Sequence, residues 1–293
     1  MIYLDNAAST QIHSDVLDSM LPFLKEQYGN PSSIHRYGRL SRKAIHKARK
    51  QIASLINADP AEILITSGGT ESNNTVLIGI SSQFPDSQII TSSIEHDAIL
   101  EPCKKLISNG FQVNYLSVDK SGIINTMDLK NTISKKTSLV SIMFGNNEVG
   151  TIQPISEIVK ICHENKVVFH TDAVQAVGKV AIDVKELGVD LLSISSHKLH
   201  GPKGVGALYI KDGVKIDPVI LGGGQEFRLR SGTENVASIV GFGQACEIAQ
   251  NNLIENSSLI KKLQTLLVKR VLDEIPEVTF NGHSEYRLSN NAH

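Results

Sequence analysis

Residues 63–74 read Ile-Leu-Ile-Thr-Ser-Gly-Gly-Thr-Glu-Ser-Asn-Asn, which is an apolar β-branched run, a pair of glycines and the start of a polar stretch. A strand, a glycine turn and a helix in this order predict one unit of an α/β fold. Paired glycines let backbone N–H groups converge on an anion, and a helix N-terminus adds positive potential. Because simple helix capping uses the same residue types, this stretch by itself predicts either a phosphate site or a cap.

The same alternation continues along the chain. Further apolar runs occupy residues 88–91, 113–118, 137–143, 167–170, 191–195 and 206–210, with amphipathic stretches from 71, over 97–108 and over 155–164. Strands that alternate with helices predict a mostly parallel central sheet sandwiched by helices. In such sheets a ligand lies beyond the carboxyl ends of the strands. The polar motifs described below each follow an apolar run, so we expect them at that edge.

Composition excludes several classes of partner. Lysine and arginine number 29 against 30 acidic residues, so no overall field attracts the chain to nucleic acid or to a membrane. The basic run 35–50 carries apolar residues at helical spacing and predicts an amphipathic helix. The cysteines are odd in number and far apart, and no signal peptide or membrane-spanning stretch is visible. We therefore expect a cytoplasmic protein with no nucleic-acid or membrane partner.

The pattern divides the chain into three parts. Residues 1–14 form an N-terminal segment, 15–245 a large α/β domain, and 246–293 a bridging helix with the start of a second domain. The helical pattern begins at about residue 236, and residues 278–282 read as a strand and a turn. The sequence thus predicts a small C-terminal domain that is incomplete within these residues.

Two further motifs carry chemistry. Residues 167–175, Val-Val-Phe-His-Thr-Asp-Ala-Val-Gln, place Asp172 at the end of a buried strand, where it either caps a helix or pairs with a cation. Residues 193–204, Ser-Ile-Ser-Ser-His-Lys-Leu-His-Gly-Pro-Lys-Gly, place Lys198 where burial can lower its pKa and make it a Schiff-base nucleophile. A phosphate turn, a strand-end aspartate and a later lysine are together the set that pyridoxal 5'-phosphate requires.

A metal site is the weaker interpretation of the histidines. His197 and His200 have chelate-like spacing, and His170 lies two residues before Asp172. Lys198 stands between the first two, however, and no pair of cysteines is clustered. The sequence therefore predicts no metal centre.

With these motifs in place, the chain resembles the class V aminotransferase group of fold-type-I pyridoxal-phosphate enzymes, and most closely the cysteine desulfurases. The motifs that extend the resemblance along the chain are Tyr3-Leu4-Asp5-Asn6-Ala7-Ala8, Gly29-Asn30-Pro31-Ser32-Ser33, Glu95-His96, Asn146-Asn147-Glu148-Val149-Gly150 and Arg230-Ser231-Gly232-Thr233-Glu234-Asn235.

The resemblance implies a role for each site residue. Lys198 would form the covalent link to the cofactor, Asp172 would pair with its pyridinium nitrogen, and His96 would stack on its ring. Gln175 would bond the phenolic oxygen, and Asn147 would lie near the substrate carboxylate. The residues implied to hold the phosphate are Gly69, Thr70, Ser195 and His197, with Thr233 supplied by the partner subunit of a homodimer.

The implied reaction converts L-cysteine to L-alanine and passes sulfur, as an enzyme persulfide, to an acceptor or iron–sulfur scaffold protein. The family's nucleophilic cysteine loop and its late arginine are expected past residue 293. Cys103, Cys162 and Cys246 lie on apolar helical positions and are expected to be buried hydrophobes. A selenocysteine lyase, an aminotransferase and a non-catalytic remnant that binds the cofactor remain alternatives.

Overall fold

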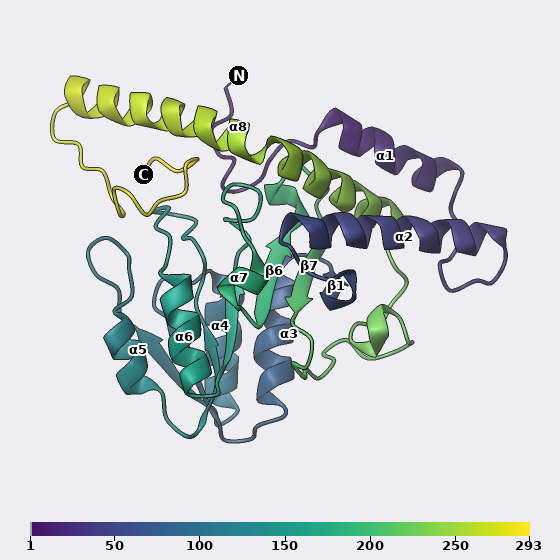
Figure 1. Ribbon diagram of the computed structural model, residues 1–293, viewed down its shortest axis with the longest axis horizontal. Coiled ribbons are helices and arrows are strands. Elements are labelled where there is room, and N and C mark those ends of the chain that lie inside the picture. Colours follow the sequence, from purple (N-terminus) through teal and green to yellow (C-terminus); the bar gives the residue numbers. More distant parts are fainter. Residues whose placement is uncertain (1) are drawn as a thin grey trace.

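A computed structural model describes residues 2–293 (Figure 1). Its α-helices are α1 (Ser14–Lys25), α2 (Arg36–Leu55), α3 (Gly69–Ser81), α4 (Asp97–Ser108), α5 (Thr126–Thr132), α6 (Ile155–Glu164), α7 (Val184–Leu187) and α8 (Val236–Glu274). Its strands are β1 (Ile63–Thr66), β2 (Gln88–Ser92), β3 (Gln112–Leu116), β4 (Thr137–Ser141), β5 (Val168–Asp172), β6 (Leu191–Ser195) and β7 (Gly206–Ile210).

The strands form one seven-stranded sheet in the order β1-β7-β6-β5-β4-β2-β3. Neighbouring strands from β3 to β6 run parallel, whereas β7 is antiparallel to both β1 and β6. The predicted mostly parallel sheet is confirmed. Because β4, β5 and β6 run side by side in one direction, the residues that follow them emerge at a single edge.

Helices cover both faces of the sheet, and the strands alternate their apolar side chains between two cores. On β1, Leu64 packs with α3 and α4, whereas Ile63 and Ile65 join the core formed with α2, α6 and α8. Leu139 and Val140 of β4 divide in the same way. A strand that is buried on both faces reads as a continuous apolar run, which is why the sequence pattern located these strands.

Helix α8 is a 39-residue helix that crosses the molecule above the sheet (Figure 1). Its first half packs against α1 and α2, and its buried residues are concentrated before residue 247. Beyond that point many of its apolar side chains are exposed, including Leu263 and Leu267. The expected boundary between 245 and 246 therefore falls inside one continuous helix.

The strand expected at residues 278–282 does not form. Residues 275–293 contain no helix and no ladder strand, and they contact the rest of the molecule through an isolated bridge between Thr151 and Arg287. The Arg287 guanidinium lies over the Phe280 ring and donates to Asn291 Oδ1 at 2.7 Å. Composition alone does not form a strand, because a strand must also pair with a neighbour. Two backbone hydrogen bonds, from Ile152 N to Tyr286 O and from Leu288 N to Gly150 O, each 2.9 Å long, hold the segment together with these side-chain contacts.

Candidate active site

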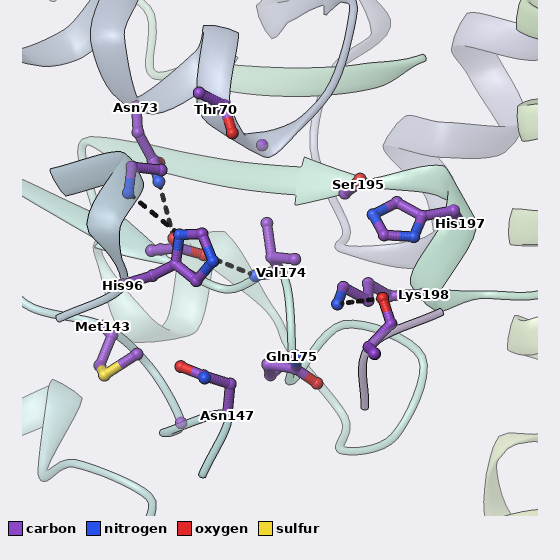
Figure 2. A pocket seen from close by; sticks show the side chains of 15 residues that line it. Thr70, Asn73, His96, Met143, Asn147, Val174, Gln175, Ser195, His197 and Lys198 are labelled. Carbon is purple, nitrogen blue, oxygen red and sulfur yellow. Dashed lines mark hydrogen bonds between the residues drawn. The ribbon is translucent and has the colours of Figure 1, made fainter. Parts of the chain in front are cut away.

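A cavity of about 260 Å³ lies at the sheet edge where β4, β5 and β6 end. Figure 2 shows the side chains that surround it. All the site residues predicted from the sequence line this cavity except Thr233: they are Gly69, Thr70, His96, Asn147, Asp172, Gln175, Ser195, His197 and Lys198. Motifs separated by more than a hundred residues therefore meet in one place, as the strand-end rule predicts.

The glycine turn between β1 and α3 forms one wall. Gly68 has a φ of 152°, which an L side chain rarely adopts, and it gives α3 no side-chain cap. At Gly69, a Cβ atom would lie 2.7 Å from Val174 Cγ2, so a larger residue cannot fit without displacing Val174. The uncapped first turn of α3 thus presents the positive end of its helix dipole to the cavity.

Asp172 ends β5 and is 7 % exposed. Its Oδ1 accepts a hydrogen bond from Val174 N at 3.0 Å, and its Oδ2 accepts one from Asn73 Nδ2 at 2.7 Å. Burial raises the pKa of this carboxyl, although both hydrogen bonds and the nearby His96 and Lys198 oppose the rise. The position is therefore one where a further cationic partner would be strongly favoured.

Lys198 lies in a single 3-10 turn that follows β6. Its Nζ donates to the carbonyl oxygens of Ala7 and Ala8, the latter at 2.8 Å. Burial lowers the pKa of this amine, while Asp172 and Asp5 act in the opposite direction. A lysine with a lowered pKa at the edge of a cavity is a suitable nucleophile for a carbonyl group.

His96 and Asn147 lie on the wall contributed by β2 and β4. His96 is the N-cap of α4, and its Nδ1 accepts a hydrogen bond from Ala98 N at 3.0 Å, which fixes the ring. Asn147 Nδ2 donates to Glu148 Oε1 at 2.9 Å. The imidazole and the amide therefore present one ring and one polar group to the same cavity (Figure 2).

Ser195 and His197 connect this cavity to a second one. Both also line an adjacent hollow of about 380 Å³, together with Ser67, Gly68 and Lys203. Burial lowers the pKa of His197, and the neighbouring lysines lower it further, so its ring favours the neutral form. The glycine turn, a hydroxyl, an imidazole and a lysine thus supply donors around this hollow, which the Glu71 carboxylate also lines.

Thr233 lies in a different hollow, of about 210 Å³, with Ser67, Gly204 and Arg230. Two ion pairs fix the loop that carries it. Arg230 Nε bonds Glu71 Oε1 at 2.9 Å, and the buried Arg49 Nη2 bonds Glu226 Oε1 at 2.6 Å. Glu226 also accepts from Ile65 N at 2.8 Å, so its carboxylate occupies the free edge of β1.

Sequence reasoning missed several residues of the site. Asn73, which bonds Asp172, lies one helical turn after Gly69 in the opening motif, so the i,i+4 spacing could have indicated it. Met143 lines the cavity directly after β4. Glu95 bridges two strand ends, with its Oε1 accepting from Ser92 Oγ at 2.6 Å and from Met143 N at 2.9 Å. Pairing of β2 with β4 creates that contact, and no local pattern reports it.

The cysteines lie away from the cavity. Cys103, Cys162 and Cys246 are all buried, as expected from the sequence. Burial raises the pKa of Cys103 and of Cys162 to about 12, and it also raises that of Cys246. A thiol reacts as its thiolate, so these side chains are inert at neutral pH.

Residues 2–293 hold no cluster of three or more His, Cys, Asp or Glu side chains suited to a metal ion. Within the same residues, no helix combines the length and the apolar character needed to cross a membrane.

Comparison with known proteins agrees with this geometry. Residues 2–291 match the family model described as aminotransferase class-V. The chain is 51% identical to "Cysteine desulfurase IscS" of Methanosarcina thermophila over 99% of its own length and 72% of that protein. It is 50% identical to the protein of the same name from Dictyoglomus turgidum, covering 74% of it.

Solved structures give the same result. A "NIFS-LIKE PROTEIN" superposes with a TM-score of 0.95 at 42% identity, covering 98% of this chain and 80% of that one. The structure named "SspA in complex with cysteine" gives 0.82 at 43% identity, covering 84% and 72%. The chain therefore belongs to the class-V aminotransferase family, and within it to the pyridoxal-phosphate-dependent cysteine desulfurases.

Proposed function

We propose that the cavity of Lys198 binds pyridoxal 5'-phosphate and serves the conversion of L-cysteine to L-alanine. The observation that carries this proposal is the meeting of a lysine of lowered pKa and a buried carboxylate in one cavity. Among residues 2–293, Asp172 accepts hydrogen bonds from Asn73 and Val174 but has no salt-bridge partner. A protonated pyridine nitrogen would supply the missing cation.

The residues present fit the cofactor at each of its polar groups. The phosphate would be held by Gly69, Thr70, Ser195 and His197 around the uncapped turn of α3. His96 would cover the ring, and Gln175 would donate to the phenolic oxygen. When bound, pyridoxal phosphate supplies an electron sink for carbanion chemistry at the substrate.

The chain's own groups would then act on protons and charge. The Lys198 amine would condense with the carbonyl group of the cofactor. Once released, it would carry a proton to or from the substrate Cα. Asp172 would keep its partner nitrogen protonated, since the carboxylate is buried and accepts only two hydrogen bonds from the described residues. Asn147 would orient the substrate carboxylate through its amide.

Sulfur abstraction needs a thiolate that the described cysteines do not provide. In the proposed reaction this thiolate attacks the substrate sulfur, the C–S bond breaks, and a proton reaches Cβ to give alanine. The sulfur stays on the enzyme as a persulfide and passes to an acceptor, such as an iron–sulfur scaffold protein. We place the nucleophile outside residues 1–293, because Cys103, Cys162 and Cys246 are buried away from the cavity.

We further propose a cytoplasmic homodimer with composite sites. Thr233 lies outside its own subunit's cavity, which is what a residue donated to a partner requires. The loop that carries it is held rigidly by the Arg49–Glu226 and Glu71–Arg230 pairs. A C2 dimer would place each Thr233 beside the other subunit's phosphate.

The test uses the protein loaded with pyridoxal phosphate and titrated with amino acids. L-Cysteine should change the visible absorbance of the bound cofactor with saturation, and L-serine should do so only at much higher concentration. The variant Asn147→Ala should weaken the response to L-cysteine by about tenfold, equivalent to about 1.4 kcal/mol. An absorbance that L-cysteine leaves unchanged would contradict the proposal.

A further inference from the structure

Lys179 is a second lysine beside the site, and the reaction proposed above does not use it. It lies in the turn that follows Asp172, where its backbone N donates to Ala176 O at 2.9 Å. Its own carbonyl accepts from Ser257 Oγ of α8 at 2.7 Å. The residue is thus fixed to both the turn and the long helix.

The ammonium of Lys179 points toward the cavity wall. Its Nζ donates to Gln175 Oε1 at 3.1 Å, and Gln175 Nε2 donates to Ala7 O at 2.9 Å. Lys198 Nζ donates to the same carbonyl of Ala7. A continuous chain of hydrogen bonds therefore joins the two lysines through one amide and one carbonyl group.

The orientation of the Gln175 amide is fixed by the hydrogen-bonding capacity of the group on each side of it. An ammonium has donors and no acceptor, so the amide atom that faces Lys179 must be the oxygen. A backbone carbonyl only accepts, so the amide atom that faces Ala7 must be the nitrogen. Reversing the Gln175 amide would oppose donor to donor at one end and acceptor to acceptor at the other.

We propose that Lys179 is a positioning residue, which holds the Gln175 amide so that its N–H group faces the Ala7 carbonyl, the same carbonyl that accepts from the Lys198 amine. The assignment rests on the proposed function only in naming the ligand that this N–H group would meet. Without Lys179, only the Ala7 carbonyl selects this orientation, so the reversed amide becomes less costly. A reversed amide would place an acceptor on the side of Ala7 and Lys198, which would favour the protonated amine.

A positive charge on Lys179 would act in the same direction as orientation, because like charges disfavour each other's protonated forms. Burial and the charge on Lys198 lower the pKa of Lys179 to about 8. The other charged groups around the Lys198 amine are Asp172 at the end of β5 and Asp5 of the N-terminal segment. Neither contacts Lys179, so a substitution there leaves them in place.

The experiment measures Lys198 in cofactor-free protein, so it does not depend on whether pyridoxal phosphate binds. Reductive methylation with formaldehyde and cyanoborohydride is followed against pH by mass spectrometry of the peptide that contains Lys198. Lys179→Met should raise the pH midpoint by about half a unit or more. Lys179→Arg, which keeps the charge and the donors, should restore it, and Lys185→Met on the exposed face of α7 should leave it unchanged.

The same comparison in a Gln175→Leu background separates the effect of amide orientation from the effect of charge. If Lys179 acts through the amide, the shift caused by Lys179→Met should shrink when Gln175 is already Leu. A shift of equal size in both backgrounds would mean that charge alone acts, and it would overturn the positioning role. An unchanged midpoint in Lys179→Met would overturn the whole proposal; should that variant not fold, Lys179→Gln provides the same comparison.

Discussion

At the scale of single residues, the site depends on groups whose charge is costly where they lie. Asp172 is the clearest case, because desolvation raises the pKa of its carboxyl above the ordinary value of 3.8. A carboxyl with a raised folded-state pKa lowers stability progressively as pH rises above its unfolded value. Charging this buried carboxyl therefore costs the cofactor-free protein stability, and the proposed function requires the charge.

The Asp172 carboxyl should lower the stability of the cofactor-free protein and raise its affinity for the cofactor, and Asp172→Asn tests both effects. The asparagine Oδ1 can still accept from Val174 N, and the Asn73 amide can reverse, since its buried Oδ1 has no partner among the described residues. We expect the cofactor-free variant to unfold at a higher urea concentration than the wild type at pH 7, because it carries no carboxyl that is costly to charge. Its affinity for pyridoxal phosphate should fall by at least about tenfold.

The matched control for this change is Asp183→Asn, at the partly exposed N-cap of α7. It should leave cofactor affinity unchanged, because Asp183 does not line the cavity. Equal cofactor affinity in the Asp172→Asn variant and the wild type would contradict the proposed pairing of Asp172 with the ring nitrogen.

At the scale of elements, Glu95 joins the ends of β2 and β4. It is fully buried, and burial raises the pKa of its carboxyl to about 8. Its Oε2 has no hydrogen-bond partner among residues 2–293. The group is therefore protonated at neutral pH, and a neutral acid holds together the strand ends that carry His96 and Met143.

The protonation of Glu95 predicts a pH dependence. Between pH 4.5 and 8 the folded state holds a proton that the unfolded state releases, so wild-type stability should fall as pH rises through this range. Glu95→Gln is neutral throughout and should lack this part of the fall. By pH 8 the variant should be more stable by roughly 2 kcal/mol or more, since each pKa unit is worth about 1.4 kcal/mol.

Urea denaturation of both proteins at pH 5 and at pH 8 measures the difference. At pH 5 the gap should be small, because the folded state keeps Glu95 neutral and the unfolded state has only begun to release its proton. If the gap between them does not widen toward pH 8, then Glu95 is not a buried neutral acid. Glu101→Gln, at an exposed position on α4, controls for the loss of a negative charge.

The elements were largely predictable from the sequence, because strands buried on both faces give continuous apolar runs. The amphipathic helix over 35–50 is confirmed as α2, with Ile45, Ala48 and Ile52 buried. The segment at 278–282 shows the limit of this reasoning. Its composition favours a strand, but a strand also needs an edge to pair with, and that is a property of the tertiary structure.

The site was predictable where each motif ends a strand or begins a helix, as at Gly69, Asp172 and Lys198. The contacts between motifs were not. The hydrogen bonds that join Lys179 to Lys198 pass through the Ala7 carbonyl, and Glu95 accepts a hydrogen bond from Met143. Such contacts follow from strand order, which a single sequence does not display.

At the scale of the whole molecule, cofactor binding and sulfur abstraction depend on different groups. A polypeptide of these 293 residues holds the predicted cofactor groups, while its cysteines are buried with raised pKa values. We expect such a polypeptide, given pyridoxal phosphate, L-cysteine and a reductant, to release alanine and sulfide at less than about one hundredth of the rate of a relative that carries the nucleophile.

Alanine and sulfide are measured together over many equivalents of substrate. The control replaces Cys103, Cys162 and Cys246 with alanine, one at a time. Multiple turnover that is abolished by one of these changes would show that a buried cysteine is the nucleophile after all. Turnover that survives all three changes would point to a thiol from outside the chain.

The cofactor assignment underlies each of these expectations, and one measurement tests it most directly. Protein incubated with pyridoxal phosphate is reduced with borohydride, digested and mapped by mass spectrometry. The cofactor mass should be fixed on the peptide that contains Lys198, unchanged in Lys185→Ala and absent in Lys198→Ala. Fixed cofactor that persists in Lys198→Ala, or that maps to another lysine in the wild type, would contradict the proposed site.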